Sequence, residues 1–186
     1  MKTLQEIYLK HKKGDWPDKG SVHSYIEVYE KLLAPYRMTA KNILEIGLMS
    51  GESLRMWNEY FSGMVYGMDI SVKPVDGLAD LTQTIKDGYN VRIGDASKPE
   101  DIESCFKGKM FDVIIEDANH DIEQQLQIFM TLKQYLTPNG IYIIEDVQNI
   151  DQDRHLFVYL DMDVRIIDRR HIKNRYDDVL VIIKHK

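Results

Sequence analysis

Seven runs of apolar, mostly β-branched residues are spaced along the chain and predict seven β-strands. The runs cover residues 42–47, 64–70, 89–95, 111–117, 140–146, 164–169 and 179–184. Most of the first five lack the polar alternation of a half-exposed strand. We therefore expect these strands to be buried on both faces of a parallel sheet.

Helical patterns lie between the strands. Residues 52–61 and 122–136 carry large apolar side chains at helical spacing, Pro99 opens a short helix, and Thr137-Pro138-Asn139-Gly140 is expected to close the long helix as a turn. Only the short polar stretch 170–178 separates the last two strands, so these should form an antiparallel hairpin. The predicted fold is α/β and Rossmann-like: a doubly wound seven-stranded sheet of five parallel strands plus a C-terminal antiparallel hairpin, with helices on both faces.

Length and composition predict one domain. With 186 residues, 44% of them hydrophobic, the chain can bury a full core as a single unit, in which residues 1–40 form an N-terminal helical segment and residues 41–186 the core sheet. The first residues have no signal-peptide character, no run is long enough to cross a bilayer, and the single Cys105 cannot form an internal disulfide. These features favour a cytoplasmic protein without a membrane partner.

The charge pattern limits the expected partners. A net charge of −6 argues against general nucleic-acid binding, which needs a basic surface. The basic stretch near the C-terminus is interpreted as a solvated hairpin, and together with the small size it is compatible with a homodimer. Its members are Arg165, Arg169, Arg170, Lys173 and Arg175.

The first three strands end in residues suited to a nucleoside. Glu45-Ile46-Gly47 runs through a short loop to Gly51, where glycine lets the backbone turn tightly against a ligand. Asp69 ends the second strand, and 69 − 47 = 22 residues is close to the spacing at which an acidic side chain meets a ribose hydroxyl. The third strand leads into Asp95-Ala96. Taken singly, each aspartate is as well explained as a helix cap or turn former.

With these residues in these places, the chain resembles the class I S-adenosylmethionine-dependent methyltransferases from about Asn42 to its end. The resemblance implies that Gly47 and Gly51 approach the methionine part of the cofactor, Asp69 the ribose, and Asp95-Ala96 the adenine. Met49 stands where the family usually has glycine. The cofactor contacts that the resemblance implies are Tyr25, Glu45, Gly47, Gly51, Ser53, Asp69, Ile70, Asp95, Ala96 and Asp117.

A narrower resemblance rests on the N-terminal segment Asp18-Lys19-Gly20-Ser21-Val22-His23-Ser24-Tyr25 and on Ser53-Leu54-Arg55-Met56-Trp57 after the glycine loop. Both are similar to the metal-dependent sugar O-methyltransferases of macrolide tailoring and their small bacterial and viral relatives. The resemblance implies that the N-terminal segment helps to cover the cofactor, with Lys19, His23 and Tyr25 as candidate contacts. Packing and helix-start roles are the alternatives for Tyr25 and His23.

Two further strands end in acidic residues. Asp117-Ala118-Asn119-His120 follows the fourth strand and Glu145-Asp146 ends the fifth. Carboxylate oxygens suit Mg²⁺, which lowers the pKa of a bound hydroxyl while a nearby imidazole accepts the proton. The resemblance implies Asp117, Glu145 and Asp146 as Mg²⁺ ligands and His120 as the base, with Asp117 also part of the catalytic pair. Helix capping by His120 and solvated turn carboxylates are the alternatives.

The sequence thus predicts a Mg²⁺-dependent O-methyltransferase that uses S-adenosylmethionine on a hydroxyl of a sugar or glycosylated metabolite. Two other functions stay open. The acceptor is a catechol-like phenol in the first, and the chain is a catalytically inactive cofactor-binding scaffold in the second. The sequence carries no short code that identifies the acceptor.

Overall fold

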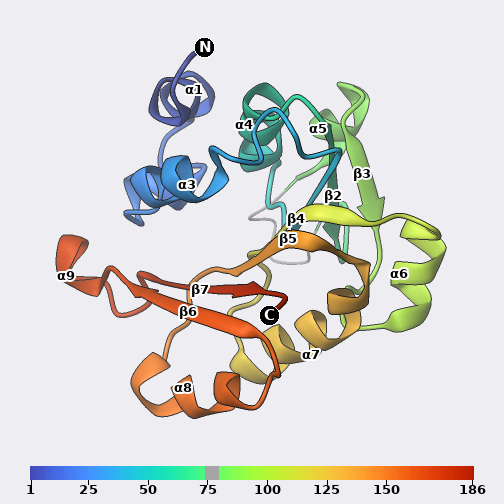
Figure 1. The fold of residues 1–186 in the computed structure, drawn as a ribbon. Helices are drawn as coiled ribbons and strands as arrows, with labels where there is room; N and C mark the ends of the chain where they lie inside the picture. The colour runs from blue at the N-terminus through green and yellow to red at the C-terminus, as the bar shows by residue number, and fades with distance from the viewer. Residues whose placement is uncertain (74–79) are drawn as a thin grey trace.

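The strands form one seven-stranded sheet in the order β3-β2-β1-β4-β5-β7-β6 (Figure 1). The structure, a computed structural model, describes residues 1–73 and 80–186. β1 to β5 run parallel, and β7 is antiparallel to both β5 and β6. The expected five parallel strands and antiparallel hairpin are confirmed. The strands are β1 (Asn42–Ile46), β2 (Met64–Asp69), β3 (Asn90–Ile93), β4 (Phe111–Glu116), β5 (Leu136–Ile144), β6 (Asp163–Asp168) and β7 (Val179–Lys184).

Helices cover both faces of this sheet (Figure 1). α1, α3 and α4 pack on one face, and α6, α7 and α8 on the other. None of the helices in the described residues is long and apolar enough to cross a membrane. The helices are α1 (Leu4–His11), α2 (Asp18–Ser21), α3 (Ile26–Leu33), α4 (Glu52–Tyr60), α5 (Thr82–Lys86), α6 (Pro99–Phe106), α7 (Ile122–Leu132), the 3₁₀ turn η1 (Lys133–Tyr135), α8 (Ile150–Val158) and α9 (Arg170–Lys173).

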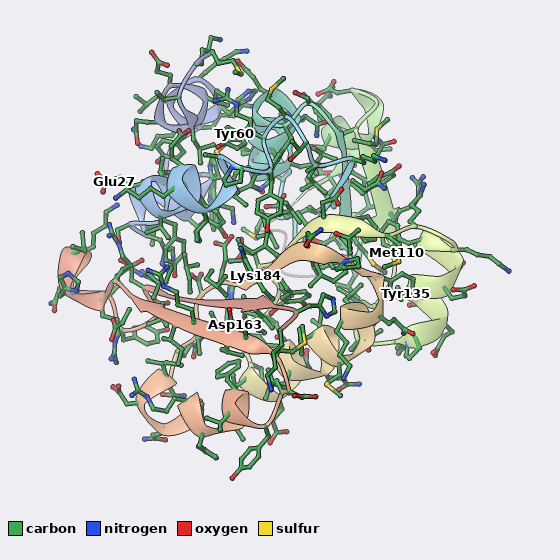
Figure 2. All side chains as sticks on the ribbon, viewed as in Figure 1. Glu27, Tyr60, Met110, Tyr135, Asp163 and Lys184 are labelled. Carbon is green, nitrogen blue, oxygen red and sulfur yellow. The ribbon has the colours of Figure 1, made fainter. Side chains whose placement is uncertain are left out.

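Successive residues of the central strands point to opposite faces of the sheet and belong to two separate apolar cores. Ile43 and Val113 belong to the core under α1, α3 and α4, whereas Leu44 and Ile114 belong to the core under α6, α7 and α8. All four are fully buried. This is the burial on both faces that runs without polar alternation predict. Figure 2 shows side chains filling the space between the sheet and the helices on either face.

The boundary between α7 and β5 differs from the expectation. α7 ends at Leu132, and β5 begins at Leu136, before the predicted turn rather than after it. Leu136 pairs with Phe111, and the register then shifts so that Val113 pairs with Ile141. Because Phe111 and Leu136 are both buried, their packing places the start of the strand ahead of the Pro-Asn-Gly segment, whose residues are absorbed by the shift.

Candidate active site

The carboxyl ends of three adjacent strands meet at one edge of the sheet. The backbone pairing continues one residue past each strand: Asp117 N donates to Ile46 O, and Glu145 N donates to Glu116 O, both at 2.9 Å. Gly47 N likewise donates to Met68 O at 2.9 Å. The first residues after β1, β4 and β5 are therefore held side by side, where open α/β sheets place their ligands.

A cavity of about 370 Å³ opens at this edge. Its volume falls within the usual range for small-molecule sites, and apolar side chains such as Met68 and Ile128 form part of its wall. Six of the residues predicted to contact the cofactor line it: Gly47, Asp69, Ile70, Asp95, Ala96 and Asp117.

The loop after β1 has the backbone conformation that glycine favours, including at the position occupied by methionine. Gly47 has φ of 83°, and a Cβ there would lie 2.0 Å from the carbonyl oxygen of Asp117. Gly51 has φ of 86° and lies against Thr84, outside the cavity lining. Met49 keeps a left-handed φ of 50°, which is unfavourable for its side chain, and it lines the cavity. Glycine at position 47 is thus required by close packing on Asp117.

Asp69 and Asp95 line the cavity and also hold their own loops. Asp69 accepts hydrogen bonds from Leu48 N at 2.8 Å and Ser71 N at 3.3 Å. Asp95 accepts from Ser97 N and Oγ, and these bonds hold the pKa of Asp95 below its usual value. Asp69 and Asp95 therefore each stabilise a turn and also line the cavity.

Four predicted cofactor contacts lie outside this cavity: Gly51, described above, and Glu45, Ser53 and Tyr25. Glu45 is fully buried and accepts hydrogen bonds from Trp57 Nε1 at 2.9 Å and from Ser53 Oγ at 3.0 Å; burial raises its pKa to about 7. Ser53 lines a smaller neighbouring pocket. Tyr25 is buried, and its hydroxyl donates to Asp146 Oδ1 at 2.7 Å. Their contacts with a cofactor stay predictions.

An acid–base group lies next to the cavity. Asp117, His120 and Asp146 each offer a ligand atom, and these atoms all lie within 4.8 Å of one another. His120 Nε2 is 3.9 Å from Asp146 Oδ2. His120 and Asp146 have φ of 59° and 56°, so both are held in left-handed backbone that non-glycine residues rarely adopt. Such strain is common at functional sites.

Glu145 does not join this group. Lys19 of α2, which is fully buried, places its ammonium 2.7 Å from Glu145 Oε1 and 2.6 Å from Asp117 Oδ2. Tyr29 also donates to Glu145 Oε1. The role of Glu145 as a Mg²⁺ ligand beside Asp117 and Asp146 stays a prediction, and an internal cation already lies against its carboxylate. The sequence motif containing Lys19 was expected to cover the cofactor.

The electrostatics of the cluster favour bound positive charge. Burial, with the nearby charge of Asp117, raises the pKa of Asp146 to about 8. Burial alone would lower the pKa of Lys19, but the carboxylates of Asp117, Glu145 and Glu45 raise it well above its usual value, so Lys19 stays protonated. One lysine does not balance this many buried carboxylates, and a divalent cation would lower the cost of ionising Asp146.

The N-terminal segment supplies a second set of contacts to Asp146. Asp18, His23 and Asp146 also place ligand atoms within 4.8 Å of one another, with His23 Nε2 at 3.2 Å from Asp146 Oδ2. The His23 ring stacks on Tyr25 at 4.8 Å between centroids. Asp18 was not predicted as a site residue, although it begins the motif that carries Lys19 and His23. Its position depends on α2 folding back over the sheet edge.

The side chains at this edge of the sheet fit both Mg²⁺ and S-adenosylmethionine, the two groups that the resemblance implies. Asp117, His120 and Asp146 combine hard oxygen ligands with an imidazole, which suits Mg²⁺ beside a base. The cavity offers Asp69 and Asp95 to hydroxyl and amino groups and apolar wall to a flat ring. Asp117 lines the cavity and also belongs to the acid–base group.

The chain is similar to methyltransferases over most of its length. Residues 44–144 match the model of a methyltransferase domain family. The chain is 33% identical over 140 residues, 70% of its own length and 35% of the relative's, to an 8-demethyl-8-alpha-L-rhamnosyl tetracenomycin-C 2'-O-methyltransferase of Streptomyces olivaceus. It is 30% identical over 153 residues to a demethylmacrocin O-methyltransferase of Streptomyces fradiae. That match covers 77% of this chain and 36% of the relative.

Solved structures share its fold. A MycE methyltransferase in complex with Mg, SAH and mycinamycin VI superposes with a TM-score of 0.68 at 20% identity, covering 98% of this chain and 54% of that one. An O-methyltransferase from Bacillus cereus in complex with SAH gives 0.65 at 22% identity, covering 98% and 90%. Fold and site thus define a class I methyltransferase architecture, as the resemblance predicts. The chain belongs to the methyltransferase domain family.

Proposed function

We propose that this protein transfers a methyl group from S-adenosylmethionine to a hydroxyl of a sugar or glycosylated metabolite, with Mg²⁺ at the acid–base group and His120 as the general base. The observation that carries the proposal is the position of Asp117. It lines the cofactor-sized cavity and lies within ligand distance of His120 and Asp146, so one residue connects the methyl donor to the acid–base chemistry.

Each residue of the proposed site has a separate role. Asp117 and Asp146 would hold the metal, and His120 Nε2 would take the acceptor's proton, with Asp146 beside it to stabilise the imidazolium. When bound, the cofactor supplies a methyl group on a sulfonium, and the metal lowers the pKa of the acceptor hydroxyl. Tyr25 and His23 orient Asp146 from the other side, and Lys19 fixes Asp117. These contacts would keep both carboxylates in place while the acceptor oxygen is aligned for in-line attack.

The curated relatives support a sugar as the acceptor. Two of them are named as O-methyltransferases of rhamnosyl tetracenomycin-C compounds, and a third as an L-olivosyl-oleandolide 3-O-methyltransferase. The chain spans about a third of the length of the curated relatives it matches. The domain described here contains both the cavity and the acid–base group, so we assign the methyl-transfer chemistry to it. A catechol acceptor and an inactive cofactor-binding scaffold are the competing outcomes of the test below.

The test measures transfer of a labelled methyl group from S-adenosylmethionine to a panel of glycosides and to catechol, with Mg²⁺ or with EDTA. We expect glycoside methylation that EDTA abolishes. His120→Ala should reduce turnover about 10²- to 10⁴-fold, the usual contribution of a general base, and leave S-adenosylhomocysteine affinity nearly unchanged by calorimetry. His171→Ala, which changes an exposed histidine of α9, is the matched control and should retain full turnover.

Each other outcome rejects part of the proposal. Methylation of catechol alone replaces the acceptor class. Binding of S-adenosylhomocysteine without transfer to any acceptor favours the scaffold. Equal turnover in wild type and His120→Ala removes the base assignment.

A further inference from the structure

A second cavity, of about 280 Å³, lies directly beside His120. It is formed where the segment after β4 faces the segment after β5 and the first turn of α8. The residues that line it are Asn119, His120, Asp121, Ile122, Gln148, Asn149 and Asp153. The mechanism above uses only His120 from this set.

The lining of this cavity is chemically unlike that of the cofactor cavity. Apart from His120 and Ile122, its members carry an amide or a carboxylate, and none is a phenylalanine, tyrosine or tryptophan. The cofactor cavity, by contrast, includes Met49, Met68 and Ile128. Amides donate and accept, and carboxylates accept, so they can hydrogen-bond adjacent hydroxyl groups in pairs. A polyhydroxylated ring satisfies such a wall, whereas a phenol ring needs apolar surface that this cavity lacks.

The two cavities meet at one residue. Asn119 lines both, and its side-chain amide donates to Gln124 Oε1, which also lines the cofactor cavity. His120 follows Asn119 and faces the polar cavity, and its Nδ1 is buried without a hydrogen-bond partner in the described part of the chain. A hydroxyl held among the amides therefore lies beside the imidazole, one residue along the chain from the cofactor cavity.

We propose that this polar cavity is the acceptor subsite, that it binds a saccharide ring, and that Gln148, Asn149 and Asp153 select the saccharide. The catalytic meaning of this assignment rests on the proposed function, but the binding itself does not. Gln148 and Asp153 are half-buried and Asn149 is exposed, so the side chains form a wall that a ligand reaches from solvent.

The test measures binding without turnover. Protein labelled with ¹⁵N and saturated with S-adenosylhomocysteine and Mg²⁺ is titrated with methyl α-glycosides of rhamnose, glucose and galactose, and separately with catechol, while side-chain amide resonances are followed by NMR. At least one glycoside should shift the amide signals of Asn119, Gln148 and Asn149. The Gln148→Leu/Asn149→Leu double variant should weaken that glycoside about tenfold or more, as expected for loss of two hydrogen-bonding groups.

Gln152→Leu is the matched control, since Gln152 is an exposed residue of the same helix that does not line the cavity. It should bind the glycoside like wild type, and all variants should keep their affinity for S-adenosylhomocysteine. The assignment is overturned if no glycoside of the panel binds, if the shifts lie elsewhere, if only catechol binds, or if the double variant binds as tightly as the control. Glycoside binding in the cavity without methyl transfer would contradict the proposed function alone, and sugar methylation with an unchanged KM in the double variant would contradict this inference alone.

Discussion

The ammonium of Lys19 lies 2.7 Å from the carboxylate of Glu145, across 126 positions of sequence and with both side chains buried. This ion pair joins α2 to the end of β5. Glu145, one of the three predicted Mg²⁺ ligands, thus has a cation of the chain itself beside its carboxylate.

Replacing Lys19 by methionine should destabilise the protein by about 3–5 kcal/mol, because it leaves buried carboxylates without their counter-charge. The double variant Lys19→Met/Glu145→Gln should recover part of that loss, since it removes one of those charges. Urea unfolding of wild type and the two variants measures both effects. Equal stability of wild type and Lys19→Met would show that the lysine does not neutralise the cluster.

Asp146 combines a proposed metal-ligand role with a left-handed backbone conformation, and two substitutions separate the two features. Asparagine is tolerated at positive φ, so Asp146→Asn should fold nearly as stably as wild type but bind Mn²⁺ at least about tenfold more weakly. Asp146→Ala should show the same loss of metal and an added cost of about 1 kcal/mol from backbone strain. Electron paramagnetic resonance gives the Mn²⁺ affinity and thermal unfolding gives the stability. Unchanged Mn²⁺ affinity in both variants would exclude Asp146 as a ligand.

Much of the fold could be predicted from the sequence, because buried parallel strands have a strong local signature. The antiparallel hairpin and the meeting of Asp117 with Asp146 follow from strand order and strand ends. The start of β5 was predicted wrongly, since the pairing of Leu136 with Phe111 outweighs the local turn signal of Pro138. The burial of Lys19 could not be predicted from the local sequence either, because it depends on contacts between α2 and distant strands.

Lys173 belongs to the basic stretch near the C-terminus that was interpreted as solvated, and it is exposed but also makes specific contacts. Its ammonium donates to the carbonyl oxygens of Gly20, Ser21 and His23 at 2.7, 2.7 and 2.8 Å. Arg170 and Arg175 pair with neighbouring aspartates. The stretch thus anchors the N-terminal segment that carries Lys19 and His23, and a charge pattern alone does not reveal carbonyl acceptors so far away in sequence.

Lys173→Met should therefore loosen the N-terminal segment without unfolding the sheet. We expect a stability loss of about 1–3 kcal/mol and faster amide hydrogen exchange at residues 18–25. Lys186→Met, which breaks an exposed pair with Asp161, is the control and should leave exchange there unchanged. Exchange in Lys173→Met that matches the control would refute the anchoring role.

Glu59 of α4 should give the protein part of its acid sensitivity. Hydrogen bonds from Lys10, Lys2 and His11 lower its pKa to about 2. Because the folded pKa lies below the unfolded value of 4.5, this stabilisation is present above pH 4.5 and is lost as pH falls toward 2. Glu59→Gln should be less stable than wild type at pH 7, by about 1 kcal/mol or less for these surface pairs, and equally stable at pH 2. Denaturant titrations at both pH values measure the difference in unfolding free energy between wild type and Glu59→Gln, and added salt should reduce it by screening the pairs. A difference that grows on acidification would contradict the prediction.

We propose that the cofactor cavity and the acid–base group form one site joined at Asp117. Paramagnetic relaxation tests it directly, using S-adenosylmethionine labelled with ¹³C in its methyl group, bound to the protein in the presence of Mn²⁺. We predict strong broadening of the bound methyl signal by Mn²⁺, and loss of that broadening in Asp146→Asn at the same metal concentration. If cofactor and Mn²⁺ both bind to wild type and the methyl signal stays sharp, the two form separate sites and the account is contradicted.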